Sequence, residues 1–289
     1  MKNKKIIFII NPVSGLGKQK GIEHIIHDIA QKHACNVTIE FTKHAGHATN
    51  LASSARIENF DIVAIVGGDG SVNEVGRALL HCETAMGIIP SGSGNGLARH
   101  FKIPLDPKRS IERIFTGSIS KMDVGKIEDH IFLSTAGFGF DAKVAHEFAK
   151  QKKRGFKTYV KTVRQELFKF NSFDFVLPKN NVNEKAFMLS VANIPQFGNN
   201  FTINPNATEN DGLLNCTLIK PFPKYKIPLI TSRFFNQSIH KSRYFQEWID
   251  SAFEFNVPHL FAHVDGEPIN LKNHQVCCTV DRSSLNVIV

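Results

Sequence analysis

The sequence has no long apolar run. The apolar stretch Ile6–Ile10 follows the basic segment MKNKK and so mimics the start of a signal peptide, but it ends after five residues, at Asn11-Pro12. A secretory signal needs a longer apolar core, and a membrane-spanning helix needs about 20 apolar residues. We therefore expect a cytoplasmic protein.

Cysteines are few and lack a functional spacing. The chain has five, of which Cys277 and Cys278 are adjacent and the others scattered. Neither a metal-binding nor a redox motif fits this pattern, so we expect reduced thiols. The P-loop of many nucleotide-binding enzymes is also missing. Its G-x-x-x-x-G-K-[ST] pattern would require a glycine in place of Pro12 and a hydroxyl in place of Gln19.

The composition is that of an ordinary globular protein, with 42% hydrophobic and 21% charged residues among 289. This length predicts about two domains. The formal net charge of +9 favours an anionic partner, which leaves nucleotide, anionic lipid and nucleic acid open. Because no nucleic-acid-binding motif is recognised, we expect no nucleic-acid partner.

Strands and helices alternate in the first part of the chain. The predicted strands are 4–10, 36–41, 61–67 and 85–90, and the predicted helices are 18–33, 47–56, 72–82 and 94–100. Strands that are apolar throughout are typical of a parallel sheet covered on both faces. We therefore predict a three-layer α/β domain over residues 1–123, whose ligands lie beyond the carboxyl ends of its strands.

From residue 124 the pattern changes to short strands separated by Asn, Gly and Pro, which is typical of a mainly antiparallel β-sandwich. We predict strands at 124–137, 171–177, 185–194, 212–219, 251–257, 260–264, 267–271 and 275–289, and helices near 140–169 and 224–247. Asp265-Gly266 predicts a hairpin turn, after which Glu267 begins the return strand. This second domain covers residues 124–289, and whether its last strand pairs with the sheet of the first domain stays open.

Three glycine-rich turns stand where predicted strands pass into helices. They are Asn11-Pro-Val-Ser-Gly15, Gly67-Gly-Asp-Gly-Ser71 and Pro90-Ser-Gly-Ser-Gly-Asn95. Glycine lets backbone N–H groups approach a ligand closely, and a helix N-terminus favours phosphate. Because all three turns belong to one end of one sheet, they predict a nucleotide polyphosphate site.

Two motifs have a second interpretation. Ser71 and Glu74 have the spacing of a capping box, although a cap does not require the two glycines that precede Asp69. Gly137-Phe-Gly-Phe-Asp-Ala142 matches a dinucleotide fingerprint, but residues 143–169 are basic and helical and lack the acidic residue at the end of a second strand. Phosphate binding is favoured for the first motif, and nicotinamide binding is disfavoured for the second.

An ordered set of motifs resembles the diacylglycerol kinase catalytic-domain family, which includes soluble bacterial lipid kinases and the sphingosine and ceramide kinases. The resemblance covers essentially the whole chain. Its motifs are Asn11-Pro-x-Ser-Gly, Gly67-Gly-Asp-Gly-Ser71, Pro90-x-Gly-Ser-x-Asn95, Met122-Asp-Val-Gly125, Gly137-Phe-Gly-x-Asp141 and Val264-Asp-Gly-Glu267.

The resemblance implies an ATP-dependent lipid kinase of phospholipid metabolism, with ATP in a cleft between the α/β domain and the β-sandwich. It implies that Asp69 and Asp123 organise a catalytic Mg²⁺ and that Glu267 is the general base. It also implies a structural Mg²⁺ at Thr208, Asp211 and Leu213. The nucleotide-binding residues that it implies are Asn11, Pro12, Ser14, Gly15, Thr42, Gly67, Gly68, Asp69, Gly70, Ser71, Asn73, Gly92, Ser93 and Asn95.

One motif departs from the bacterial pattern. Many bacterial members have Gly-Thr-x-Asn-Asp where this chain has Gly92-Ser-Gly-Asn-Gly96, a form more similar to the sphingosine and ceramide kinase branch. Serine keeps the hydroxyl, whereas Gly96 loses a carboxylate. The resemblance therefore leaves the lipid open between a diacylglycerol-like and a sphingoid substrate.

Residues 150–169 carry eight Lys and Arg against one acid, Glu166, with apolar residues at helical spacing. Such a segment is either a solvated helix packed by its apolar stripe or an interfacial helix that binds anionic lipid. We expect the second, and with it peripheral association with the membrane that holds the substrate. Two other functions stay open: an NAD kinase, which shares Gly-Gly-Asp-Gly, and a catalytically silent lipid- or nucleotide-binding module. A homodimer is also open.

Overall fold

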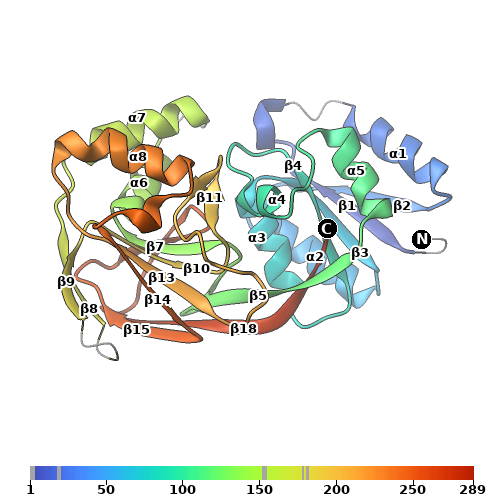
Figure 1. The fold of residues 1–289 in the computed structure, drawn as a ribbon. Helices are drawn as coiled ribbons and strands as arrows, with labels where there is room; N and C mark the ends of the chain where they lie inside the picture. The colour runs from blue at the N-terminus through green and yellow to red at the C-terminus, as the bar shows by residue number, and fades with distance from the viewer. Residues whose placement is uncertain (1–3, 18–20, 152–154, 178, 180–181) are drawn as a thin grey trace. The chain divides into compact units, whose positions relative to one another are not determined.

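The protein's computed structural model describes residues 4–17, 21–151, 155–177, 179 and 182–289 (Figure 1). The chain forms two units. Unit 1 contains residues 1–123 and 282–289, and unit 2 contains residues 124–281. The last eight residues of the chain therefore lie in unit 1, with the first part of the sequence.

Unit 1 is built on a parallel sheet in the order β2-β1-β3-β4. Near the end of the chain, β18 joins it parallel to β4, where Val287 pairs with Met86. The apolar runs predicted as strands are buried along their whole length in β1, β3 and β4, as expected for a covered sheet. The strands are β1 (Ile6–Ile10), β2 (Val37–Phe41), β3 (Ile62–Gly67), β4 (Ala85–Pro90) and β18 (Gln275–Ile288).

Helices cover both faces of this sheet. On one face, α1 and α5 pack through Ile26 and Ile114 against the side chains of alternate strand residues such as Phe8. On the other face, α2 and α3 cover residues such as Ile9, which is fully buried. The helices are η1 (Ser14–Gly17), α1 (Ile22–Lys32), α2 (His47–Ile57), α3 (Asp69–Ala78), α4 (Gly96–His100) and α5 (Pro107–Thr116). The three-layer prediction is confirmed.

Unit 2 contains a six-stranded antiparallel sheet in the order β14-β13-β10-β7-β16-β17. A second antiparallel group pairs the start of β18 with β15, then β8 and β9, and β5 pairs with β6. The strands are β5 (Ile119–Ile127), β6 (His130–Phe132), β7 (Thr135–Gly139), β8 (Phe173–Leu177), β9 (Val182–Ala186), β10 (Met188–Ala192), β11 (Gln196–Gly198), β12 (Phe201–Thr202), β13 (Leu214–Ile219), β14 (Phe245–Asp250), β15 (Ala252–Asn256), β16 (Phe261–Val264) and β17 (Glu267–Asn270).

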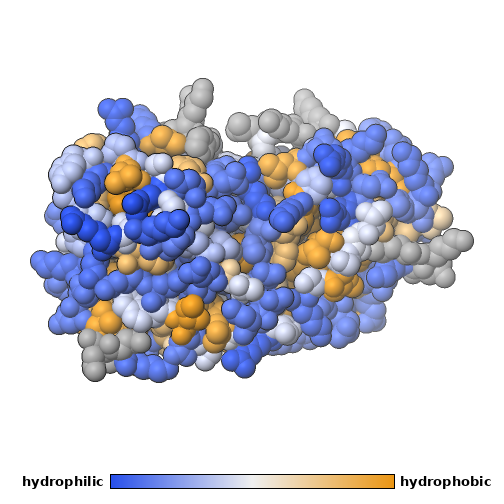
Figure 2. All heavy atoms as spheres, in the orientation of Figure 1, coloured by the Kyte–Doolittle hydropathy of each residue, from blue (hydrophilic) through white to orange (hydrophobic). Residues whose placement is uncertain are grey.

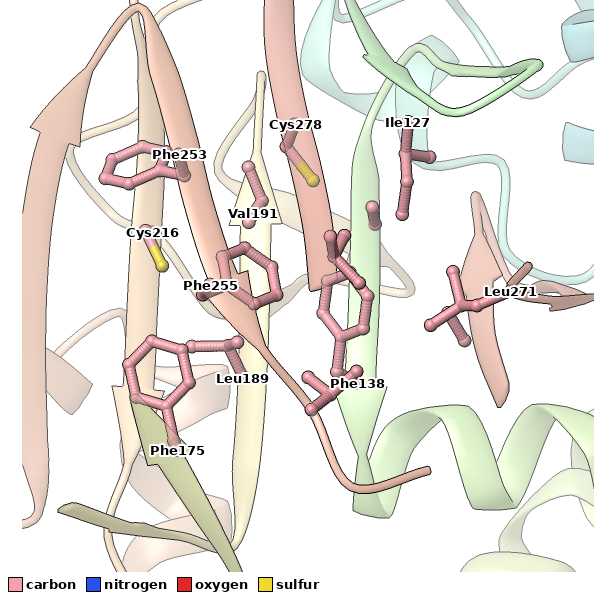
Figure 3. Packing of buried hydrophobic residues seen from close by; sticks show 14 of the residues in the cluster. Ile127, Phe138, Phe175, Leu189, Val191, Cys216, Phe253, Phe255, Leu271 and Cys278 are labelled. Atoms are coloured by element: carbon pink, nitrogen blue, oxygen red, sulfur yellow. The ribbon is translucent and has the colours of Figure 1, made fainter. Parts of the chain in front are cut away.

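The inner faces of these strands enclose an apolar core (Figure 3). Phe138 of β7 and Phe255 of β15 meet edge to face with ring centroids 5.0 Å apart, and Phe175 of β8 packs on Phe255. All three are essentially inaccessible to solvent. The core thus joins strands of both sheets, which confirms the β-sandwich.

The helices of unit 2 are α6 (Phe140–Ala149), α7 (Phe156–Leu167), η3 (Lys224–Lys226), α8 (Ile227–Phe235) and η4 (Ile239–Lys241). No helix in the described ranges is long and apolar enough to cross a membrane.

Several predicted boundaries were wrong. The predicted strand 124–137 is the end of β5, then β6 and β7, and the predicted helix 140–169 is two helices. The predicted helix 224–247 ends at Phe235, because Gln237 takes a left-handed conformation (φ 59°), and β14 begins at Phe245. Helix α5 was not predicted, although Asp106-Pro107 marks its start: the Asp106 carboxylate accepts the Arg109 N–H.

Candidate functional site

The turn after β1 is joined to the turns after β3 and β4. Asn11 directly follows β1, and its Nδ2 donates a hydrogen bond to Ser71 Oγ over 2.8 Å. Ser14 Oγ donates to the backbone oxygen of Asn11 (2.9 Å) and shares a hydrogen bond with Ser91 Oγ (2.7 Å). These side chains bring the first predicted glycine turn together with the other two.

The turn after β3 passes directly into α3. Gly68 is the N-cap residue, and glycine has no side chain with which to cap the helix. The capping-box interpretation is therefore wrong: the helix begins at Asp69, so Ser71 is already helical and accepts the hydrogen bond from Asn11 instead.

Glu74 of α3 caps a different helix. Its two carboxylate oxygens accept the N–H groups of Gly46 (2.9 Å) and Ala48 (3.1 Å), at the N-terminus of α2. A carboxylate there satisfies unpaired N–H groups and interacts favourably with the helix dipole. Glu74 thus ties α3 to the turn after β2. We missed this role because the spacing of Ser71 and Glu74 suggested a partner in the same helix.

Asp69 holds the N-terminus of α4. Its Oδ2 accepts the N–H of Asn95 (2.9 Å), and its Oδ1 accepts the N–H of Gly96 (2.7 Å). Gly96, where the motif departs from the bacterial pattern, therefore contributes its backbone. Carboxylate oxygens accept more than one partner, so these bonds are compatible with a cation on the same group.

Two glycines bring the turns after β3 and β4 into backbone contact. A Cβ on Gly92 would lie 2.7 Å from Gly68 Cα and 2.9 Å from Asn95 Oδ1. Asn95 fixes its own turn, because its Oδ1 accepts the Gly92 N–H and its Nδ2 donates to the Gly92 carbonyl, both over 2.9 Å. The result is a close, braced pair of turns at the N-termini of two helices, the kind of backbone arrangement that binds phosphate.

The other predicted nucleotide-binding residues lie in or beside the same four turns. Thr42 follows β2 and donates its N–H to the Ile10 carbonyl (2.9 Å). Pro12 and Gly15 lie in the turn after β1, Gly67 ends β3, Gly70 and Asn73 lie in the first half of α3, and the exposed Ser93 lies between β4 and α4. Their contact with a nucleotide stays a prediction.

Asp123 is 1% exposed. Its Oδ1 accepts the N–H of Ser283 (2.6 Å), so this carboxylate joins β5 to the returning end of β18 within unit 1. Sequence reasoning gave Asp123 a role at a metal but did not anticipate this backbone partner. Its role toward Mg²⁺ stays a prediction.

Among the described residues, no three His, Cys, Asp or Glu side chains form a metal-binding cluster. A nucleotide-bound Mg²⁺ needs only one or two carboxylates, because phosphates and water complete its shell. Asp69 and Asp123 are carboxylates, the ligand type that suits Mg²⁺. At the second predicted site, Asp211 Oδ1 accepts the Leu213 N–H (2.9 Å), and Thr208 is exposed. The structural Mg²⁺ at these residues stays a prediction.

In unit 2, Glu267 begins β17 directly after the predicted hairpin turn. Asp265 and Gly266 have φ of 49° and 83°, and Val264 pairs with Glu267. Two left-handed residues are the requirement of this tight turn, so the hairpin prediction is confirmed. Glu267 is exposed at the start of the strand.

Asp265 anchors that turn to another part of unit 2. Its Oδ2 accepts the N–H of Leu133 (2.8 Å), and its Oδ1 accepts those of Ser134 (2.7 Å) and Thr135 (3.0 Å). In return, the Asp265 N–H bonds the Thr135 carbonyl (2.9 Å). The aspartate of the Val-Asp-Gly-Glu motif is therefore both a turn residue and a clamp on the β6–β7 connection.

Comparison with known proteins gives two family matches. Residues 5–127 match the diacylglycerol kinase catalytic domain, and residues 134–289 match the YegS C-terminal NAD kinase beta sandwich-like domain. The chain belongs to the diacylglycerol kinase catalytic-domain family. The resemblance inferred from the motifs is confirmed.

Members of this family from several bacteria are similar over most of their length. A diacylglycerol kinase of Mycobacterium tuberculosis (strain H37Rv) is 29% identical over 235 residues, which cover 77% of this chain and 75% of that protein. A probable lipid kinase YegS-like of Yersinia enterocolitica is 26% identical over 273 residues, 90% of each. The chain is thus a homologue of lipid kinases.

The solved structure of a putative diacylglycerol kinase from Bacillus anthracis str. Sterne has the same fold. It aligns with a TM-score of 0.79 over 100% of this chain and 98% of that one, at 21% identity. The fold also agrees with the interpretation that disfavours a dinucleotide site at Gly137–Ala142. Gly137–Ala142 spans the end of β7 and the start of α6, and β7 is antiparallel to both of its neighbours, so no parallel βαβ unit forms.

Proposed function

We propose that the chain is an ATP- and Mg²⁺-dependent lipid kinase that transfers the γ-phosphate of ATP to a lipid hydroxyl, on a diacylglycerol-like or sphingoid substrate. Family membership supports the kinase class, and the names of the relatives support a lipid acceptor. The main support for an ATP site is that hydrogen bonds connect the turns after β1, β2, β3 and β4 in unit 1. Asn11, Asp69 and Glu74 make these bonds.

The backbone of these turns is the proposed phosphate cradle. Backbone N–H groups at the N-terminus of α3, together with the dipole of that helix, would bind the polyphosphate. Asp69 and Asp123 would hold Mg²⁺, which neutralises phosphate charge during transfer. Hydrogen bonds between these turns hold their backbone in place, which would limit the reordering that nucleotide binding requires.

Glu267 is the proposed general base. As the lipid oxygen forms its bond to the γ-phosphorus, the hydroxyl proton passes to the Glu267 carboxylate, and the bond from that phosphorus to the bridging oxygen of ADP breaks. One positioned carboxylate suffices for the proton transfer. Its place at the first residue after a braced turn supports this role.

The proposed partner is an anionic membrane surface, bound by the ends of α7 and α8. Lys224 Nζ lies 5.6 Å from the ring centroid of Phe168, which links the end of α7 to η3. Phe168, Tyr225 and Leu229 have exposed fractions of 57%, 78% and 51%. Figure 2 shows hydrophobic residues interspersed with hydrophilic ones over this side of unit 2. Apolar side chains among Lys and Arg suit an anionic lipid interface. Lys152, Lys153 and Arg154 of the predicted segment lie outside the described residues.

The deciding experiment measures transfer of radiolabelled γ-phosphate from ATP to a mixed lipid extract with Mg²⁺. We expect a labelled lipid from the wild type, and a kcat lower by about 10³-fold in Glu267→Gln with unchanged ATP affinity. The mobility of the product identifies the acceptor. Label in NADP⁺ instead, when NAD⁺ is offered, would support an NAD kinase, and bound ATP without any transfer would support the silent module.

Vesicle co-sedimentation tests the membrane partner separately. We expect binding to phosphatidylglycerol vesicles, weaker binding to phosphatidylcholine, and loss of the difference in Lys161→Glu/Arg164→Glu. Tyr225→Ser/Leu229→Ser should weaken binding to both lipids. Equal sedimentation of all variants would reject this surface.

A further inference from the structure

We propose that His263 and Asp141 are positioning residues for Glu267: they form a buried hydrogen-bonded pair that holds the Asp265–Gly266 turn from inside unit 2. This inference rests on the proposed function for the role of Glu267. Asp141 ends the motif Gly137-Phe-Gly-x-Asp141, but the proposed chemistry gives neither Asp141 nor His263 a role.

The pair reaches the turn through the two ring nitrogens of His263. Nδ1 accepts the N–H of Gly266 over 3.3 Å, and Nε2 lies 3.3 Å from Asp141 Oδ2. The side chains are 3% exposed for His263 and 10% exposed for Asp141. A continuous path of hydrogen bonds therefore runs from Asp141, at the start of α6, to the peptide group between Asp265 and Gly266, one residue before Glu267.

The contacts select one tautomer. The Gly266 N–H is a donor, so Nδ1 must be unprotonated, and the single ring proton must then lie on Nε2, directed at Asp141. Asp141 is consequently the acceptor of that bond. Burial raises the pKa of the Asp141 carboxyl above its ordinary value, and the bond to His263 acts in the opposite direction. A positively charged His263 would carry a proton on Nδ1 and would lose the bond to Gly266.

The space for the pair comes from Gly137 on the neighbouring strand β7. A Cβ at this position would lie 2.2 Å from both Asp141 Oδ2 and His263 Nε2. His263 and Gly137 are cross-strand partners, and the Phe197 ring packs against the imidazole with centroids 5.5 Å apart. Glycine in the family motif Gly-Phe-Gly-x-Asp is thus required here by the close approach of two polar side chains.

The turn has a second support, which sets the size of the expected effect. Asp265 already bonds three backbone N–H groups of residues 133–135, so losing the histidine contact would leave the hairpin folded. We expect the loss of this contact to increase the range of positions that the backbone of residues 265–266 samples. Small displacements of a reacting group lower the rate far more than they lower stability.

Two substitutions separate positioning from packing. In His263→Asn, the amide oxygen takes the place of Nδ1 and keeps an acceptor for Gly266, whereas in His263→Gln the longer side chain resembles Nε2 and fills more space. The Asn variant keeps the acceptor for Gly266 but loses the contact with Asp141, so we expect its kcat to fall by about threefold. We expect the Gln variant, which loses the acceptor for Gly266, to fall by about tenfold, with KM for ATP unchanged in both. Equal losses, or a smaller loss in the Gln variant, would overturn the proposal.

Amide hydrogen exchange of Gly266, followed by NMR in the same proteins, gives a readout that needs no activity. We expect slow exchange in wild type and His263→Asn, and exchange about tenfold faster in His263→Gln and in Gly137→Ala, which separates the pair sterically. If the Gly266 N–H exchanges at the wild-type rate in both His263→Gln and Gly137→Ala, the proposed contact is rejected. If these proteins show the expected exchange rates but the wild type phosphorylates no lipid, the proposed function and the role of the pair in catalysis are rejected. The contact between His263 and the turn would still be supported.

Discussion

The turn after β3 in unit 1 and the β16–β17 turn in unit 2 use the same device. In each, the aspartate of an Asp-Gly step accepts backbone N–H groups from another turn: Asp69 takes two from residues 95 and 96, and Asp265 takes three from residues 133–135. Both aspartates come from short motifs. The motif alone does not distinguish an aspartate that braces a loop from one that only binds a ligand.

The two turns differ in where the partner comes from. Asp69 bonds the turn at the end of the neighbouring parallel strand, which is the next strand along the chain. Asp265 bonds a segment about 130 residues earlier, brought near by the antiparallel pairing of β16 with β7. The first brace follows from the topology of a parallel sheet, whereas the second requires the register of a sandwich. Substitutions in each turn test this difference.

The largest effect is expected for Asp265→Ala. It leaves three backbone N–H groups without their charged acceptor and removes the side chain that fixes the turn. We expect unfolding free energy to fall by about 3 kcal/mol, because bonds to charged groups are worth about 1.5–3 kcal/mol each and are not additive. Urea denaturation measures this. Asp129→Ala is the matched control, since that carboxylate is 76% exposed, and we expect no measurable loss. Similar losses of unfolding free energy in both variants would show that the bonds of Asp265 to residues 133–135 contribute no more stability than an exposed carboxylate does.

A smaller and more local effect is expected for Gly92→Ala in unit 1. The new Cβ would collide with Gly68 Cα and Asn95 Oδ1, so the turns after β3 and β4 must separate. We expect ATP to bind about thirtyfold more weakly, the equivalent of about 2 kcal/mol. Gly46→Ala is the comparison: its φ is 81°, but apart from its chain neighbours no atom of the described residues lies within 4 Å of the added Cβ. Calorimetric titration with an ATP analogue should show a loss for Gly92→Ala well beyond that of Gly46→Ala.

Much of unit 1 was predictable because its information is local. Each buried strand is one apolar run, each glycine turn follows it, and the parallel topology puts all turns at one edge. The β-sandwich was predictable in class but not in detail. The strand predicted at 124–137 is three strands, since pairing between β5 and β6 depends on Phe132 lying beside Gly125, where a side chain would have no room.

In the candidate site, the sequence indicated residue types better than it indicated partners. Glu74 was assigned to its own helix because the capping box is a local pattern, but its carboxylate bonds Gly46 in α2. The pairing of His263 with Asp141 had no signal at all, since 122 positions separate them and only the strand register brings them together. Contacts between residues so far apart in the sequence cannot be predicted from local patterns.

The smallest effect is expected at Glu147 in α6, because its carboxylate binds lysine side chains instead of backbone N–H groups. Lys143 and Lys150 donate to its Oε1 over 2.8 and 2.9 Å, which lowers the pKa of Glu147 to about 2 from its ordinary 4.5. A carboxyl whose pKa is lower in the folded state stabilises the protein above pH 4.5, and that contribution disappears as the pH falls toward 2.

Water reduces the size of that contribution, because the side chains of Lys143, Lys150 and Glu147 are 37%, 67% and 24% exposed. We therefore expect Glu147→Gln to lower the unfolding free energy by only about 0.5 kcal/mol at neutral pH, and by less in about 0.5 M NaCl. The gap between variant and wild type should shrink as the pH is lowered from 7 to about 3. A pH-independent gap would mean that the loss comes from packing. A gap as large as that of Asp265→Ala would mean that side-chain ion pairs hold this unit as firmly as bonds to its backbone.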